Sequence, residues 1–235
     1  MSSACERVFV SGANRGIGLE FVRRCLETGA VVTAACREPD EAADLRALRD
    51  EFGTSLVVER LDVTSEESIA GLARRLAEAR VRFDLLVSNA GVCEREGFGE
   101  WTMAALMDQL CVNVAGAALL CQALAPMLNE GGKVVQLGSR MGSLELNLNG
   151  AAPVDGYSIS KAGLNMVTRR LANHLAERRV CVVSMSPGWV RTEMGGEQAD
   201  LSVEDAVGAM LAAIGRLGFE DSGSFLGSDG CVVPW

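Results

Sequence analysis

The single tyrosine of this chain, Tyr157, stands four positions before Lys161, which is one of only two lysines among 22 basic residues. Residues at positions i and i+4 of a helix share a face, so this spacing can place an ammonium group beside a phenol. A unit charge about 4 Å away is worth roughly 4 kcal/mol at an effective dielectric constant near 20. That is enough to lower a tyrosine pKa by up to about 3 units from its usual value near 10, before desolvation subtracts. The pair alone also fits a half-buried tyrosine beside a solvated lysine, so other motifs must decide.

A glycine-rich motif directly follows the first apolar run of the chain. It reads Ser11-Gly12-Ala13-Asn14-Arg15-Gly16-Ile17-Gly18. Its three glycines let the backbone turn tightly and approach a pyrophosphate, whose charge is favoured at the amino terminus of a helix. After a first strand, such a turn predicts a dinucleotide site. The spacing Gly-x-x-x-Gly-x-Gly differs from the Gly-x-Gly-x-x-Gly of most other Rossmann proteins.

The elements that position these residues are short apolar strands alternating with longer helix-period segments. Continuous Val/Leu strands, each followed by a helix, predict a parallel sheet covered on both faces. The fold class is therefore α/β: a single-domain, doubly wound, Rossmann-like sheet of about seven strands, with its ligand at the carboxyl ends of the strands. The strands are expected at residues 7–11, 31–35, 55–61, 85–88, 134–137, 180–185 and near 224–226.

Three segments show how the predicted helices begin and end. The first covers residues 17–28 and is closed by Gly29, and another covers 39–52. Thr64 and Glu67 are spaced as a capping box for a third. The apolar stretch 110–128 is interrupted by polar, glycine and proline positions, so it is interpreted as a buried helix and not as a membrane span.

Composition restricts the classes of partner. With 49% hydrophobic and 23% charged residues over 1–235, the chain has an ordinary globular composition and no linker-like segment, which favours one domain. A net charge of −9 argues against nucleic acid or an acidic membrane as a partner. The amino terminus lacks a signal-peptide pattern. We therefore expect a soluble, cytoplasmic protein.

Cysteine and histidine offer no metal site or histidine-based triad. None of the eight cysteines forms a Cys-x-x-Cys pair, and most lie in apolar segments where a free thiol buries like a small hydrophobe. The only histidine, His174, lies in a helical pattern. The expected metal content is none.

In combination, these motifs resemble the short-chain dehydrogenase/reductase family over nearly the full length. Besides the glycine turn and the Tyr157/Lys161 pair, the resemblance rests on Asp62-Val63, Asn89-Ala90-Gly91, Asn113, Ser139, Pro187-Gly188 and Thr192, each on its expected element. Within the family, the chain is most similar to a small carbonyl-reductase-like group that includes C-factor and sniffer. That likeness lies in Met141-Gly142-Ser143, Ser160-Lys161-Ala162-Gly163-Leu164-Asn165 and Pro187-Gly188-Trp189-Val190.

The resemblance implies a role for each matching residue. Ser139 holds the substrate carbonyl oxygen, Tyr157 exchanges its proton, Lys161 supplies the charge and bonds the nicotinamide ribose, and Asn113 holds a water linking Lys161 to solvent. The implied cofactor-binding residues are Ser11, Gly12, Asn14, Arg15, Gly16, Ile17, Gly18, Arg37, Asp62, Val63, Asn89, Ala90, Gly91, Tyr157, Lys161, Pro187, Gly188, Val190 and Thr192.

The chain departs from the family pattern in three places. Ser11 replaces the usual threonine and Ser88 the first of two asparagines, although both keep a small hydrogen-bonding side chain. Eighteen positions separate Ser139 from Tyr157, where the family usually has about a dozen. If Ser139 is the catalytic serine, residues around 146–155 must loop out. Ser143 is the competing candidate, and Ser139 is preferred because it directly ends a strand.

Charge indicates which nucleotide the site takes. A site selective for NAD normally ends its second strand with an acid that bonds the ribose 2′-hydroxyl. Here that strand ends in Ala35-Cys36-Arg37, and Arg15 stands in the glycine turn. Two arginines without the acid suit the 2′-phosphate of NADP(H).

The sequence therefore predicts an NADPH-dependent oxidoreductase that reduces aldehydes or ketones and reversibly oxidises alcohols. Apolar residues after the motifs indicate an apolar substrate pocket: Val92, Cys93, Met141, Leu144, Trp189 and Met194. The alternative is an NADP(H)-binding signalling or sensor protein of C-factor type with little relevant turnover. The family resemblance also suggests a homodimer or homotetramer.

Overall fold

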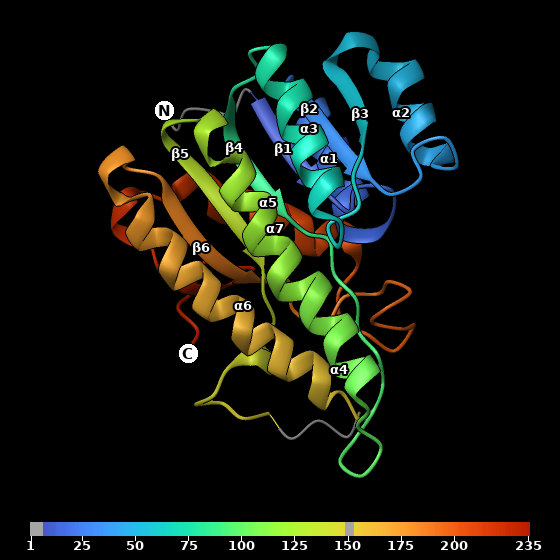
Figure 1. The fold of residues 1–235 in the computed structure, drawn as a ribbon, viewed down its shortest axis with the longest axis vertical. Helices are drawn as coiled ribbons and strands as arrows, with labels where there is room; N and C mark the ends of the chain where they lie inside the picture. The colour runs from blue at the N-terminus through green and yellow to red at the C-terminus, as the bar shows by residue number, and fades with distance from the viewer. Residues whose placement is uncertain (1–6, 149–152) are drawn as a thin grey trace.

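The computed structural model describes residues 7–148 and 153–235, in which seven strands form one parallel sheet. Its order is β3-β2-β1-β4-β5-β6-β7. The chain starts in the middle of the sheet, moves outward to β3, and returns to add β4 on the other side of β1 (Figure 1). This confirms the predicted doubly wound sheet. The strands are β1 (Arg7–Ser11), β2 (Val31–Cys36), β3 (Leu56–Arg60), β4 (Phe83–Ser88), β5 (Leu128–Leu137), β6 (Cys181–Ser186) and β7 (Phe225–Gly227).

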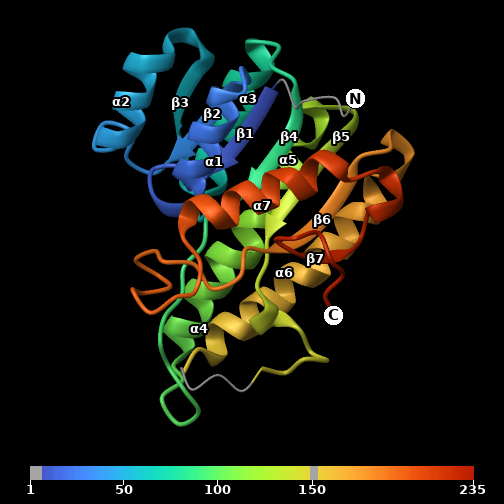
Figure 2. The same cartoon turned by 180° about the vertical axis from the view of Figure 1, so that it is seen from behind.

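Helices cover both faces of the sheet (Figures 1 and 2). One face carries α1 (Gly16–Glu27), α2 (Ala43–Phe52) and α7 (Val203–Arg216). The other carries α3 (Glu66–Glu78), α5 (Ala117–Leu124) and α6 (Asp155–His174). Strand β1 shows why the strands are apolar throughout: Val8 and Val10 enter the core on the first side, and Phe9 enters the core on the second.

The apolar stretch at the middle of the chain forms three consecutive helical pieces. These are α4 (Met103–Leu110), a π-helical turn (Cys111–Gly116) and α5. By length and composition alone, Met103–Met127 is also apolar enough to cross a membrane. In this structure, α5 buries Leu120, Cys121 and Leu124 against the sheet and packs against α3 and α6, as the core helix of a globular protein does.

One predicted helix start is wrong. The capping residue of α3 is Ser65, whose hydroxyl accepts the Ser68 amide at 3.1 Å. Thr64 does not cap, because both its amide and its hydroxyl donate to Asp62 Oδ1, at 2.9 and 2.7 Å. A nearby carboxylate thus competes successfully for the polar groups of Thr64.

The other element boundaries differ from the predicted ones by a few residues at most, except that β5 begins at Leu128, six residues early. The predicted loop at 146–155 lies partly outside the described residues. That residues 1–235 form one domain stays a prediction.

Candidate functional site

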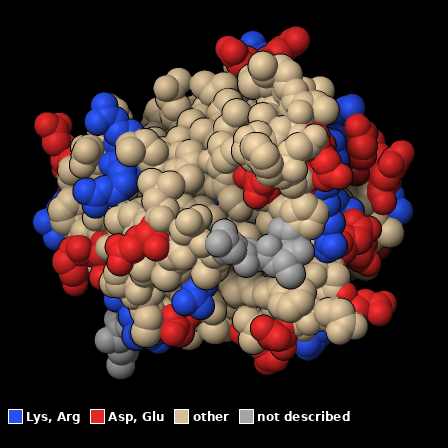
Figure 3. All heavy atoms as spheres, turned by 90° about the horizontal axis from the view of Figure 1, so that it is seen from below, with Lys and Arg blue, Asp and Glu red and all other residues tan. Residues whose placement is uncertain are grey.

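The predicted site residues follow the carboxyl ends of the strands. These strands end toward the lower half of Figure 1, where the segments after β4, β5 and β6 gather. The strand order reverses between β1 and β4, and a ligand crevice is expected at such a switch point. Figure 3 looks onto this side of the molecule, and its charged side chains lie mostly along the rim.

The glycine turn between β1 and α1 is built around two close backbone approaches. A Cβ on Gly18 would lie 2.2 Å from the Gly12 carbonyl oxygen, so no larger residue fits there. Gly12 has φ +62°, and a Cβ on it would lie 2.9 Å from Ala90 Cα. The glycines therefore allow the turn to pack tightly, and Asn14 and Arg15 lie exposed on it.

Ser11 and Asn89 tie this turn to the segment after β4. Ser11 Oγ accepts the amides of Asn89 and Ala90 at 3.1 and 3.2 Å. Asn89 Nδ2 donates to the carbonyls of Ser11 and Gly12 at 3.0 and 2.9 Å. Serine thus supplies at position 11 the hydroxyl acceptor that the family resemblance implied.

Ser139 and Tyr157 lie together, and the pKa of Tyr157 is shifted in the direction opposite to the expected one. The Ser139 hydroxyl lies close enough to the phenol to lower the tyrosine pKa by itself. Burial is the larger effect and raises the pKa of Tyr157 to about 12. The predicted lowering is wrong for this structure, because burial disfavours the phenolate and outweighs the effect of Ser139.

Lys161 is buried beneath the tyrosine, with 5% of its surface exposed. Its Nζ donates to the Leu137 carbonyl at the end of β5, at 2.7 Å. Burial lowers the pKa of Lys161 to about 8, since an ammonium loses hydration there. A Cβ on Gly91 would lie 3.7 Å from this Nζ and 3.2 Å from Asn113 Oδ1, so the predicted ribose segment passes next to both.

Asn113 lies in the π-helical turn and is fully bonded. Its Oδ1 accepts the Val92 amide at 2.9 Å, and its Nδ2 donates to the Val92 carbonyl at 2.8 Å and to Ser160 Oγ at 2.9 Å. The side chain thus joins α4–α5, the segment after β4 and the helix that carries Lys161. The sequence analysis named Ser160 only as part of a family motif and gave it no role in the site.

The structure separates the two candidate serines. Ser143 is 3% exposed, and its hydroxyl donates to the carbonyls of Pro234 and Trp235 at 2.7 and 3.2 Å and accepts the Leu146 amide at 3.0 Å. Of the two, only Ser139 lowers the pKa of the phenol.

Cys93, which the sequence analysis placed in the substrate pocket, also lies close to Tyr157 and Lys161. Its thiol interacts electrostatically with both Tyr157 and Lys161. Burial raises the pKa of this thiol, so it is protonated at neutral pH.

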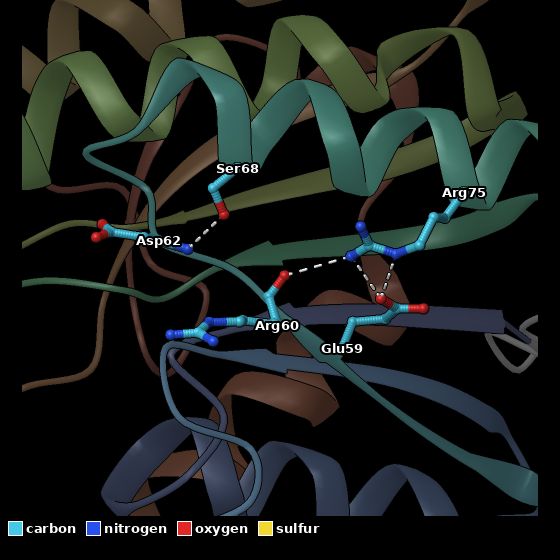
Figure 4. Close-up of polar contacts among 5 residues, drawn as sticks. All are labelled: Glu59, Arg60, Asp62, Ser68 and Arg75. Carbon is cyan, nitrogen blue, oxygen red and sulfur yellow. Dashed lines mark hydrogen bonds and ion pairs between the residues drawn. The ribbon is translucent and has the colours of Figure 1, made fainter.

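The expected adenine end lies at the edge of the sheet, where α3 holds the segment after β3 (Figure 4). The Asp62 amide donates to Ser68 Oγ at 2.9 Å, and Arg75 reaches back to Glu59 Oε2 at 2.8 Å and to the Arg60 carbonyl at 3.5 Å. Bonds from Thr64 keep the pKa of Asp62 low, with smaller contributions from Arg37 and Arg60. The predicted Arg37 is thus placed beside Asp62. Arg60, which the sequence analysis did not select, adds a second cation.

The segment after β6 lies over the glycine turn. A Cβ placed on Gly16 would lie 3.4 Å from Thr192 Cγ2. Within this segment, Val190 forms a β-bridge with Leu201, and Gly188 has a φ of +87°. Arg15 does not join Arg37 but forms an ion pair with Glu193 in this segment. Sequence spacing gave no signal for a pair 178 positions apart.

Other chemistry has little support in the described part of the chain. Within it, no three His, Cys, Asp or Glu side chains gather to hold a metal ion. Six cysteines in residues 7–148 and 153–235 are free thiols: Cys36, Cys93, Cys111, Cys121, Cys181 and Cys231.

Known proteins resemble this chain over most of its length. A family model described as enoyl-(acyl carrier protein) reductase matches residues 12–221. The 1-hydroxy-2-glutathionyl-2-methyl-3-butene dehydrogenase of Rhodococcus sp. (strain AD45) is 35% identical, covering 97% of this chain and 99% of its own. C-signal of Myxococcus xanthus is 37% identical over 65% of this chain and 92% of its own. The structure of NADPH-bound carbonyl reductase from chicken fatty liver matches with a TM-score of 0.93 at 32% identity, covering 98% of this chain and 99% of that one. These findings confirm the resemblance that the motifs predicted.

Proposed function

The chain belongs to the short-chain dehydrogenase/reductase family, and from this premise we propose that it is an NADPH-dependent reductase of aldehydes or ketones, reversible as an alcohol dehydrogenase. The observation that carries the proposal is the meeting of Ser139, Tyr157 and Lys161 at the end of β5, next to the glycine turn.

The residues at the site fit NADP(H). The Gly12–Gly18 turn at the start of α1 would hold the pyrophosphate, and the exposed Arg37 would offer a guanidinium to the 2′-phosphate. Asp62 and Val63 would border the adenine, and Gly91, which lies close to Lys161, would border the ribose. When bound, the cofactor supplies the hydride. The NADPH named for the chicken enzyme supports this choice.

The chain's own residues supply the proton. A pKa near 12 keeps Tyr157 protonated at neutral pH, so it can donate its proton to the oxygen of a carbonyl substrate that Ser139 holds. Lys161 orients the ribose and stabilises the phenolate that remains after the transfer. Asn113 is assigned the role of holding a water that links Lys161 to solvent, and its bond to Ser160 Oγ ties it to the helix that carries Lys161.

The substrate is proposed to be a carbonyl compound with an apolar body. Exposed apolar side chains come from the segments that border the site: Leu144 is 80% exposed, Trp189 52% and Met194 43%. The name of the Rhodococcus relative adds glutathionyl-bearing alcohols as one class to assay.

The test is NADPH oxidation with a panel of aldehydes and ketones, repeated with Tyr157→Phe. That variant removes the phenolic proton and little else, so turnover should fall by about 10² to 10⁴ while NADPH still binds. Turnover in Tyr157→Phe equal to that of the wild type would contradict the proton-donor role.

The second candidate is an NADP(H)-binding signalling or sensor protein, favoured by the similarity to C-signal. Binding alone does not require a buried lysine beside a tyrosine, so this candidate leaves the catalytic pair without a purpose. Tight NADPH binding with no turnover on any carbonyl of the panel would favour it.

We further propose that the protein is cytoplasmic and forms a homodimer or a homotetramer. Helices α4 and α6 pack against each other and expose apolar side chains, with Met103 at 76%, Met107 at 45% and Met166 at 62%. Molar mass in solution, measured for the wild type and for Met166→Glu, tests this assembly.

A further inference from the structure

The segment Pro187–Leu201, called here the 187–201 loop, is held together by its own hydrogen bonds. Arg191 N donates to the Leu201 carbonyl at 2.9 Å, and Leu201 N donates to the Trp189 carbonyl at 3.0 Å. Trp189 Nε1 donates to the Gly195 carbonyl at 2.8 Å. Gly196 N donates to the Thr192 carbonyl at 2.8 Å. A loop bonded in this way presents its outer side chains from a defined framework.

Two adjacent residues of the loop contact the glycine turn. The Thr192 methyl group lies over Gly16, and Glu193 Oε2 pairs with Arg15 Nη1. Both charged side chains remain largely open to solvent, with 65% of Arg15 and 74% of Glu193 exposed. The pair therefore connects the expected phosphate-binding turn with the segment expected to border the nicotinamide.

The Glu193 carboxylate pairs with Arg15, whose guanidinium would otherwise be available to a nucleotide phosphate. A guanidinium presents forked donors that suit carboxylate and phosphate oxygens alike. Arg15 cannot satisfy both anions fully, and a carboxylate next to a phosphate repels it. We propose that Glu193 sets the affinity of this site for NADP(H), by holding Arg15 until a phosphate replaces it. The inference rests on the proposed function, since it needs a bound nucleotide.

The expected effect is modest because the pair is exposed. Pairs of this kind contribute roughly 0.2 to 1 kcal/mol, which corresponds to about 1.5- to 5-fold in a dissociation constant. Removing the Glu193 charge should therefore tighten NADPH binding by about two- to fivefold. The gain should shrink in high salt, where exposed charges are screened.

The experiment measures NADPH binding directly, by calorimetry without a carbonyl substrate, in Glu193→Gln. Glu197→Gln is the matched control: it lies exposed on the same loop, makes the same change in net charge, and has no ion pair among the described residues. The comparison is repeated in an Arg15→Ala background. We expect tighter binding for Glu193→Gln, wild-type binding for Glu197→Gln, and no gain from Glu193→Gln when Arg15 is absent.

Two results overturn the inference while leaving the proposed function intact. One is wild-type NADPH affinity in Glu193→Gln. The other is a gain that persists without Arg15, which would mean that Glu193 acts through general repulsion and not by competing for that guanidinium. If the wild type itself does not bind NADPH, the proposed function fails instead.

Discussion

At the scale of residues, Lys161 and Tyr157 share one environment, and burial moves their pKa values in opposite directions. Desolvation disfavours the charged form of each group, so the ammonium releases its proton more easily, with a pKa of about 8, while the phenol keeps its proton up to about pH 12. Near pH 7 the pair is therefore an ammonium beside an intact phenol. That protonation state suits donation of a proton to a carbonyl oxygen.

Replacement of Ser139 and replacement of Ser143 should impair different properties of the protein. Ser139→Ala removes the hydroxyl close to Tyr157, so kcat should fall by about 10² or more with little change in stability. Ser143→Ala removes a buried hydroxyl that bonds the Pro234 carbonyl, so the free energy of unfolding should fall by about 1 to 3 kcal/mol while kcat changes little. Steady-state kinetics and urea unfolding of both variants measure this. A larger kcat loss in Ser143→Ala would reverse the assignment.

Arg37 should decide between the two nucleotides. Arg37→Asp places a carboxylate where the 2′-phosphate is expected and offers an acceptor to a free ribose hydroxyl. A charge-assisted contact is worth roughly 1.5 to 3 kcal/mol, so NADPH affinity should fall by about tenfold to a hundredfold, and the preference for NADPH over NADH should erode or reverse. The kcat/KM for both nucleotides in wild type and variant measures it. Equal use of both by the wild type would make Arg37 a plain surface charge.

At the scale of elements, the π-helical turn and the segment after β3 fit together through one glycine. A Cβ on Gly116 would lie 2.6 Å from the Val63 carbonyl oxygen, so the absence of a side chain lets these two segments touch. The same turn carries Asn113. The expected adenine end and the proposed proton-donating end of the site are thus connected through the helix between them.

Gly116→Ala should therefore push Val63 away, weakening NADPH binding and lowering the melting temperature. Gly208→Ala in α7 is the control, because nothing lies within 4 Å of the added Cβ and alanine favours a helix over glycine by about 1 kcal/mol. Thermal unfolding and NADPH titration of both variants test this. Equal behaviour of the two would show that the Val63 contact has no consequence.

The sequence predicted the elements well because their signals are local, and it failed where a competing carboxylate, the depth of burial or a distant partner decides the outcome. The apolar runs and the glycine turn identified the strands and the first helix. Thr64 was misassigned as a cap because the carboxylate of Asp62 captures its hydroxyl. The pKa of Tyr157 was expected to fall because spacing reveals the lysine but not the depth of burial. The partner of Arg15 was missed because the 187–201 loop meets the turn only in three dimensions.

At the scale of the whole molecule, burial of the Lys161 amine lowers the free energy of unfolding, and the fold tolerates this loss of stability. Lys161 has a pKa of about 8 in the folded chain against an ordinary 10.5, a difference of roughly 3 kcal/mol at about 1.4 kcal/mol per unit. Between those two pH values the unfolded chain holds more protons, so the Lys161 contribution to the free energy of unfolding rises with pH there.

Lys161→Met has a side chain of similar length and no charge. The variant should therefore lose turnover and should lack this contribution to the pH dependence of the free energy of unfolding. From pH 7 to pH 9 the wild type should gain about 1 kcal/mol relative to the variant. The comparison is needed because buried Cys121 and Cys181, with pKa values raised to about 12, lower stability above pH 9 in both proteins. Urea unfolding of both proteins without cofactor measures this difference. Equal changes in the free energy of unfolding of the two proteins between pH 7 and pH 9 would contradict the prediction.

The bonds between Ser143 and Pro234, 91 positions apart, have a consequence for hydrogen exchange. The Glu145 amide donates to the Trp235 carbonyl at 2.8 Å, and the Val233 amide donates to the Phe225 carbonyl at 2.7 Å. An amide bonded in this way exchanges with deuterated solvent only when its contact opens. Both bonds open when residues 231–235 detach as one unit, so Glu145 and Val233 should show one common protection factor. That factor reports how often this segment opens and releases the chain that follows Ser139.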